Sequence, residues 1–359
     1  MTTPLPDWAW LLTAYGPEGD PDEAYRLAVE LEAAGDLHAA AVAWNRAYGL
    51  DPSDPTTRRR RQELLTALGV ELNGLRFRYV PGGTFLMGSD DGDPDEAPAH
   101  PVRLDPYWVQ EAPLTWHDFQ RVQGWAGGFP PREQSPKAPV RLGFFHLNEG
   151  NKIRHQYCGD DYDEQSPRGD AFAVRGFASK PMVSVAWQDV VSMALTLEDR
   201  CDDYVVDLPT EAEWERAARG GLIGRRYPWG DDPPSPDRAD FDHFGDFEIR
   251  PPRQLPPNGY GLYGMAGGVW EWCSDWYDAE AYARRATSDD GVAVNPRGPA
   301  RGLEKVLRGG SWADCAGALR VSFRSARSSV SWRTQSWGGH HTPNLGARLA
   351  LRPITRVLP

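Results

Sequence analysis

The sequence predicts an α+β protein with little regular secondary structure, preceded by a small helical unit. Three observations lead to this prediction. Residues 1–70 carry apolar side chains at helical spacing. From Phe77 onward the apolar runs are short and are interrupted by Gly, Pro and Asp. The chain also contains 37 Gly, 32 Pro and 15 Trp, so we expect buried aromatic rings, rather than long elements, to hold it together.

The length and composition set the class of protein. A chain of 359 residues can form one large domain and a small one that are stable without disulfide bonds or structural metal ions. The formal net charge of -12 disfavours non-specific binding to nucleic acid or to anionic membranes. No apolar run reaches the length of a membrane span, and no basic and apolar leader opens the chain. We therefore expect a cytoplasmic protein.

The cysteines and the basic residues say little about function. Cys158, Cys201, Cys273 and Cys315 lie far apart and never have Cys-x-x-Cys spacing. We expect free thiols in a reducing compartment, rather than a zinc site or a disulfide framework. Nearly all basic residues are Arg, a bias that either a thermophile or a GC-rich genome would produce.

The helical unit is predicted to contain three helices. Two amphipathic runs, at residues 23–34 and 37–50, are separated by Gly35-Asp36, and a third run covers residues 57–68. The first two resemble one tetratricopeptide repeat. Because a single repeat rarely stands alone, we expect this unit to dock on the main domain or on a partner.

The main domain is predicted to begin with short strands. They are expected at residues 77–80, 84–87 and 102–104. Pro81-Gly82-Gly83 predicts a turn, a short helix is expected from Trp116, and residues 124–180 have the composition of an irregular surface insertion. A further helix is expected at residues 187–197.

One helix has a clear start signal. Thr210 follows Pro209, and Glu213 stands three residues later, which is the spacing of a capping box. The rest of the chain, rich in Gly and Trp, shows little regular periodicity. We expect a compact but irregular fold there.

Motifs from residue 75 to 352 resemble, in the same order, the formylglycine-generating-enzyme or sulfatase-modifying-factor family. The matching motifs lie at residues 80–89, 98–104, 181–187, 208–215, 258–263, 269–272 and 308–312. The resemblance implies an elaborated C-type-lectin-like domain over residues 75–359. It does not fix the function, because one fold hosts many activities.

Two enzyme activities known on this scaffold require residues that are not found here. The resemblance implies that the formylglycine-forming oxidase holds copper with two cysteines placed shortly after the Gly-Gly-Ser motif. Here Cys315 stands alone and the second position falls at Leu319 or Arg320; one thiol cannot form a two-sulfur site. Ergothioneine-type sulfoxide synthases need a His-rich helical domain, whereas the N-terminal unit offers only His38.

Residues 310–350 resemble the display segment of a third group, the variable proteins of diversity-generating retroelements, which are often encoded by phages or prophages. These proteins frame a hypervariable face between Gly-Gly-Ser-Trp and a closing Gly-x-Arg. Their adenine-directed diversification of Asn codons does not produce Lys, Glu, Met, Gln or Trp. From Gly310 to Ala350 there is no Lys, Glu or Met and only one Asp. The alternative is a small-residue loop in an ordinary family member.

The resemblance implies separate scaffold and display residues. The scaffold residues would be Arg308, Gly309, Gly310, Ser311, Trp312, Arg320, Arg324 and Arg348. The candidate ligand-binding residues are Ala313, Asp314, Cys315, Ala318, Phe323, Ser328, Ser329, Ser331, Arg333, Thr334, Gly338, Gly339, His340 and His341. Among these, Phe323, Arg333 and the two His are expected to contribute most to binding. Ala347 stands where the family usually has Phe.

Metal sites are expected to be secondary. The resemblance implies that the motif around Glu271 helps to bind a structural calcium ion in relatives, with Asn258, Glu271 and Asp275 as the candidate ligands here. Gly268 occupies the usual Asn position. His340 and His341 are adjacent, so on a strand they would point to opposite faces and would not form a metal pair.

We therefore expect a non-catalytic ligand-binding protein that requires no cofactor. Its ligand would be a protein or a cell-surface molecule, and not a nucleic acid. Two alternatives remain open: an oxidoreductase of the sulfatase-modifying type, and a cytoplasmic adaptor that uses the helical hairpin.

Overall fold

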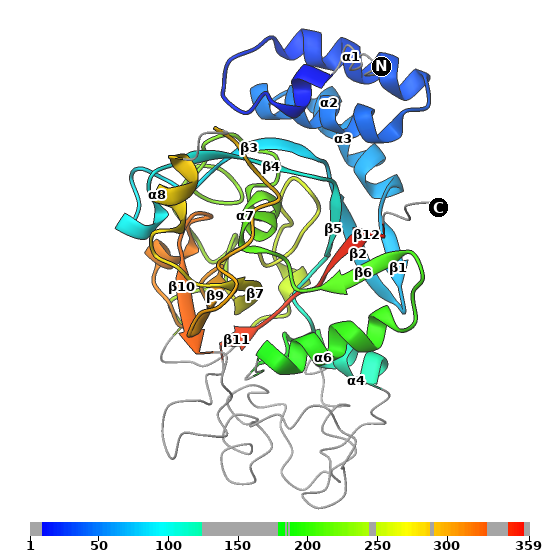
Figure 1. Cartoon of the computed structure of the whole chain (residues 1–359). Coiled ribbons are helices and arrows are strands. Elements are labelled where there is room, and N and C mark those ends of the chain that lie inside the picture. The colour runs from blue at the N-terminus through cyan, green and yellow to red at the C-terminus, as the bar shows by residue number, and fades with distance from the viewer. Residues whose placement is uncertain are drawn as a thin grey trace, which may run out of the picture.

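The computed structural model describes residues 9–123, 179–183, 185, 187–243, 249–287, 291–328 and 344–354. Three curled sheets and short helices form the main body, and a bundle of helices sits on one side of it (Figure 1). No helix in these ranges is both long and apolar enough to span a membrane.

The helical unit follows the expected boundaries closely. After a short 3-10 turn, η1 (Ala9–Leu12), it contains α1 (Pro21–Ala33), α2 (Leu37–Leu50) and α3 (Pro55–Ala67). Each of the three α-helices begins after an Asp whose carboxylate accepts backbone N–H groups of the first turn. The rings of Tyr25 and Trp44 pack edge to face at 5.0 Å between α1 and α2.

Arg61 of α3 joins the helical unit to the main domain. It is buried and donates to the carbonyl oxygens of Gly259, at 2.6 Å, and Gly220, at 3.0 Å. Its guanidinium lies between the rings of Tyr48, at 4.3 Å, and Tyr260, at 4.7 Å. The unit is therefore docked on the main domain through a buried cation, while its likeness to a tetratricopeptide repeat stays a prediction.

The sheets are small and separate. The five-stranded sheet has the order β1 (Val70–Leu72), β2 (Leu75–Val80), β5 (Tyr107–Gln110), β12 (Ala350–Pro353) and β6 (Tyr204–Asp207). The three-stranded sheet contains β3 (Gly83–Met87), β4 (His100–Leu104) and β8 (Ala293–Val294). The four-stranded sheet has the order β10 (Ser325–Ser328), β9 (Glu304–Arg308), β7 (Trp270–Trp276) and β11 (Leu345–Gly346).

Short helices connect and cover these sheets. They are η2 (Pro94–Glu96), α4 (Trp116–Gln123), α6 (Trp187–Glu198), α7 (Glu211–Arg219), η7 (Pro252–Gln254), α8 (Ala281–Ala286) and η8 (Ala316–Leu319). Helix α7 runs through the middle of the body (Figure 1). Its predicted capping box is present, with Thr210 and Glu213 each accepting the other's backbone N–H.

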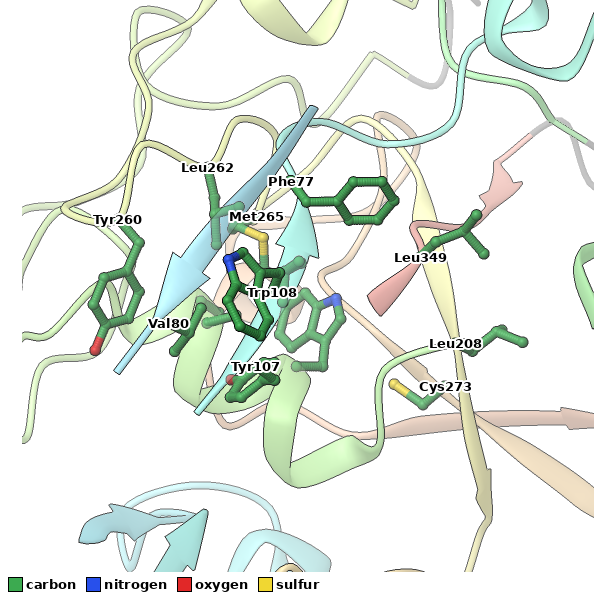
Figure 2. Close-up of a cluster of buried hydrophobic side chains, with 14 of the residues drawn as sticks. Phe77, Val80, Tyr107, Trp108, Leu208, Tyr260, Leu262, Met265, Cys273 and Leu349 are labelled. Carbon is green, nitrogen blue, oxygen red and sulfur yellow. The ribbon is translucent and has the colours of Figure 1, made fainter. Parts of the chain in front are cut away.

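The main core collects aromatic and aliphatic side chains from distant parts of the chain. Phe77, Trp108 and Leu349 converge there from three neighbouring strands or strand ends, as Figure 2 shows. The polar tips of the buried rings have partners: Tyr107 Oη donates to the Glu213 carbonyl at 2.6 Å, and Trp108 Nε1 to the Leu68 carbonyl at 2.7 Å. These bonds satisfy the polar groups of the large rings inside the core.

Two features of the sheets differ from the expectation. The strands on the two sides of Pro81-Gly82-Gly83, where a turn was expected, do not pair with each other, because β2 and β3 belong to different sheets. Strands β7 and β9 lie in the stretch where little periodicity was expected. Every residue of β7 is buried or half-buried, so the strand lacks the alternation that marks a strand with one exposed face.

The C-terminal frame and the candidate ligand-binding face

Two glycines redirect the chain after β9. Gly309 and Gly310 have φ angles of 101° and 70°, in the left-handed region that favours glycine. A Cβ atom on Gly309 would lie 3.1 Å from the Trp214 ring, and one on Gly310 would lie 2.8 Å from the Ala318 carbonyl oxygen. The Gly-Gly pair is therefore required both by its backbone angles and by close packing.

Arg308, the last residue of β9, is a fully buried cation. Its Nη2 atom lies 2.5 Å from Glu215 Oε2 on α7, and its guanidinium also donates to the carbonyl oxygens of Val321 and Ser322. Burial acts to lower the pKa of Arg308, but Tyr282 and the two α7 carboxylates, Glu215 and Glu211, hold it above its usual value. Arg308 thus fastens the chain on both sides of the Gly-Gly turn to α7.

Arg324 makes a second link to the same helix. Its Nε and Nη2 atoms donate to the two oxygens of Glu211 at 2.7 and 3.1 Å, and its guanidinium lies 4.2 Å from the centre of the Tyr282 ring. Burial alone would raise the pKa of Glu211, but Arg324 and Arg308 lower it to about 2. Glu211 is therefore held as an anion between two arginines.

Arg320 and Arg348 complete the set of predicted scaffold arginines. Arg320 donates to Glu96 Oε2 at 3.0 Å, and this carboxylate belongs to η2, more than two hundred residues earlier in the chain. Arg348 donates to both oxygens of Glu271 at 2.6 and 2.7 Å, and Trp214 Nε1 donates to the same carboxylate at 2.6 Å. All four arginines are buried.

We call this set of pairs the arginine frame; it consists of Arg308, Arg320, Arg324 and Arg348 with their partners Glu96, Glu211, Glu215 and Glu271. The remaining scaffold residues pack beside it. Trp312 is buried and bonds through its backbone to Gly268 and His243, and Ser311 is buried and hydrogen-bonded to Asp314. The carboxylate partners were not among the expected site residues, although Glu211 and Glu215 stand at the i, i+4 spacing that shares one helix face.

Residues 73–353 match the family model described as a sulfatase-modifying factor enzyme 1-like domain. A formylglycine-generating enzyme of Streptomyces coelicolor is 34% identical over 297 residues, which are 76% of this chain and 87% of that protein. The enzyme of the same name from Thermomonospora curvata is 33% identical, over 65% of this chain and 81% of that protein.

The chain belongs to the sulfatase-modifying-factor family. Among solved structures, Treponema denticola variable protein 1 superposes with a TM-score of 0.54 at 21% identity, over 79% of this chain and 98% of that chain. This likeness shows the fold. The predicted α+β, C-type-lectin-like class is therefore confirmed for this member of the family.

Copper of the kind that the oxidases of this family use does not fit the thiols of this member. Cys315 is exposed at the start of η8, and Leu319, at the expected second position, is fully buried. The copper site that the resemblance implies uses two thiolates, and a single thiol cannot supply it. The sequence between residues 310 and 350 contains no other cysteine, so the two-thiolate site of the family's oxidases is incomplete here.

The candidate calcium ligands do not fit a calcium ion either, which corrects the expectation for Asn258, Glu271 and Asp275. Both oxygens of Glu271 are used by Arg348. Asp275 accepts backbone N–H groups of Glu211 and Gly298, and Asn258 Oδ1 accepts those of Tyr260 and Leu262. Asn258 also bonds to carbonyls near the end of α7, whereas Asp275 lies at the start of that helix, so the three candidates do not surround one ion.

The structure describes six of the candidate ligand-binding residues. Cys315 and Ser328 are exposed, and Ala313, Asp314 and Phe323 are half-buried. Phe323 packs on the Trp270 ring at 5.9 Å and lies under the Arg320 guanidinium. Ala318 is only 7% exposed because it packs beneath Gly310, so we correct its assignment as a displayed residue. The other candidates, Ser329, Ser331, Arg333, Thr334, Gly338, Gly339, His340 and His341, lie outside the described residues.

Proposed function

We propose that this protein is a non-catalytic ligand-binding protein whose C-terminal segment, residues 310–350, presents a diversified face. The arginine frame carries the proposal. Its four cations are fixed by carboxylates on α7, η2 and β7, and none of the displayed candidates supplies one of those carboxylates. Exchange of Ala313, Cys315 or Ser328 would therefore leave these ion pairs in place.

The composition of the segment supports the same proposal. Residues 310–350 contain no Lys, Glu or Met, which is what adenine-directed diversification of Asn codons would leave. The fold is also that of a solved variable protein from Treponema denticola. A face supported by rigid side chains loses little conformational entropy on binding, so new specificities can arise by exchange of single side chains. The ligand that we propose is a protein or another cell-surface molecule.

The decisive experiment is to sequence the DNA that flanks the gene. We expect a near copy of codons 310–350 that differs mainly at adenines, beside a gene for a reverse transcriptase. If the flanking DNA contains neither, the proposal of a diversified face is wrong. A library of random residues at 313, 315 and 328 supplies an independent test: most variants should fold with melting temperatures close to that of the wild type.

A second candidate function is that of an oxidoreductase of the sulfatase-modifying type. The observation in its favour is the 34% identity to a formylglycine-generating enzyme. Copper content and oxygen consumption of the purified protein, for the wild type and for Cys315→Ser, distinguish the two functions. Stoichiometric copper with oxygen uptake that needs Cys315 would establish the enzyme and overturn the binding proposal. Cys201→Ser, at a half-buried cysteine remote in sequence from the Gly-Gly turn, is the control.

A further inference from the structure

A cavity of about 440 Å³ lies where the β1–β2 turn meets the start of α4 and the short helix η7, which contains Arg253. None of its lining residues belongs to segment 310–350. Its volume falls in the range of about 300–1,000 Å³ that is typical of small-molecule sites. The cavity is thus a candidate site distinct from the displayed face.

The lining of this cavity is strongly basic, although the whole chain carries a net charge of -12. Arg76, Arg121 and Arg253 line it, and Asp118 is its acidic residue. Asp118 is engaged locally: its Oδ2 atom accepts from the backbone N–H of Thr115 at 3.0 Å and from the Thr115 hydroxyl at 2.8 Å. The guanidinium groups therefore exceed the carboxylate in the lining by two positive charges.

A buried carboxylate behind the cavity positions two of these arginines. Glu111 is 2% exposed, and the Nε atoms of Arg76 and Arg253 lie 3.0 and 3.3 Å from its oxygens. Arg78 approaches the same carboxylate at 3.5 Å. Three cations thus share one anion. Within the part of the chain that the structure describes, the Nη atoms of Arg76 and Arg253 have no other bonded group, so both guanidinium ends are available to a ligand.

Arg121 lies on the α4 side of the cavity, where two contacts hold its guanidinium group. Its Nη1 atom donates to the Gly74 carbonyl at 2.5 Å, which fixes α4 to the β1–β2 turn, and its Nη2 atom lies 3.4 Å from His117 Nδ1. Guanidinium groups fixed at one edge present their remaining N–H groups as a fork that suits tetrahedral oxyanions. With Arg78 and Glu111 included, four arginines face two carboxylates, and the two positive charges in excess would balance a phosphate monoester dianion.

We infer that this cavity binds the phosphate group of a small phosphate monoester. Arg76 and Arg253 would bond to the phosphate oxygens from the Glu111 side and Arg121 from the α4 side. A phosphate group fills only a part of the cavity, and the remaining space would take the organic part of the ligand. A bound dianion would also relieve the repulsion among the three arginines.

The test is calorimetric titration of the full-length protein at constant ionic strength. The probes are inorganic phosphate, a sugar phosphate and the same sugar without phosphate. We expect saturable binding of both phosphate compounds, tighter for the sugar phosphate, and none for the neutral sugar. Arg76→Gln and Arg253→Gln should each weaken phosphate binding about tenfold, the usual effect of one charge-assisted contact. Arg76→Lys should weaken it less, because it keeps the charge but loses the fork.

The matched control is Arg225→Gln. Arg225 lies outside this cavity, its side chain is 50% exposed, close to the 55% of Arg76, and it pairs with Asp231. If it reduces phosphate affinity as much as Arg253→Gln does, binding reflects overall charge and the inference is wrong. Absence of saturable phosphate binding also overturns it. If Arg76→Gln fails to fold, Arg121→Gln tests the opposite wall of the cavity.

Discussion

At the scale of single residues, the arginine frame makes stability depend on buried cations. Arg308 has no exposed surface and neutralises Glu215 at 2.5 Å. We predict that Arg308→Gln lowers the free energy of unfolding by about 3–5 kcal/mol, because Glu215 keeps a buried charge with one partner fewer. Urea denaturation followed by tryptophan fluorescence measures this. Arg301→Gln removes an exposed arginine and should cost less than about 0.5 kcal/mol.

Asp275 provides a residue-scale prediction about pH. Burial, followed by the nearby charge of Glu211, raises the pKa of this carboxyl to about 6. The folded protein therefore binds this proton more tightly than the unfolded chain does. Between about pH 4 and pH 6 the folded state loses stability as pH rises, on the order of 3 kcal/mol from this group. Above pH 6 the carboxyl is charged in both states, and the loss is complete.

The Asp275→Asn variant isolates this effect. Since Asn does not titrate, the stability of the variant relative to wild type should rise by on the order of 3 kcal/mol between pH 4 and pH 7. Denaturation curves for both proteins at several pH values give the difference. A difference that stays constant with pH would show that Asp275 has an ordinary pKa in the folded protein.

At the scale of elements, α7 begins with the strongest local signal in the sequence. The Thr210 hydroxyl accepts from the Glu213 backbone N–H at 3.1 Å. We predict that Thr210→Ala costs about 1 kcal/mol of stability, since it leaves that N–H without its cap. Thr210→Ser keeps the hydroxyl and should cost clearly less. Thermal unfolding of the two variants compares them directly, and equal losses would mean that the cap contributes nothing.

How far the elements can be predicted depends on how local their signals are. The helices at the N-terminus and α7 have caps and amphipathic spacing within a few residues, and their observed bounds lie close to the expected ones. Strands β7 and β9 gave no such signal. Glu271 and Cys273 on one face of β7 are buried, as are Trp270 and Trp272 on the other, so the strand lacks the alternation of buried and exposed residues that would reveal it.

For the candidate site, the sequence predicts the arginines but not the carboxylates that pair with them, because those partners lie far away along the chain. The four arginines can be predicted from the sequence because they lie in motifs that resemble those of the family. Their partners cannot: Glu96 lies 224 residues before Arg320, and Glu271 lies 77 residues before Arg348. Nothing in one sequence tells which buried carboxylate will meet which arginine. Likewise Ala318, a small residue in a small-residue segment, could be recognised as buried only from the packing under Gly310.

At the scale of the whole molecule, Arg61 is the clearest connection between the helical unit and the main domain. Burial lowers its pKa, and the two carbonyl oxygens that it reaches belong to the main domain. We predict that Arg61→Gln costs about 3 kcal/mol in docking, the scale expected for charged hydrogen bonds lost inside an interface. Hydrogen exchange should then speed up across α1, α2 and α3 while α7 stays protected.

The control for this prediction is Arg59→Gln. Arg59 is on the same helix, but its side chain is 68% exposed and pairs with Glu63 at 3.6 Å. Exchange in the helical unit should be unchanged by this substitution. Faster exchange spread evenly over both parts of the Arg61→Gln protein would instead mean that the unit and the main domain unfold together.

The four-stranded sheet has a consequence for how this protein can change in evolution. Strand β10 lies at one of its edges and β11 at the other, so the chain leaves the sheet at Ser328 and rejoins it at Leu345. The distance between these two points is set by the sheet. Both strands are held by pairing with their neighbours, β10 with β9 and β11 with β7. We expect the sheet to persist when foreign peptides are inserted between Ser328 and Leu345, which would make the molecule a carrier of inserted epitopes.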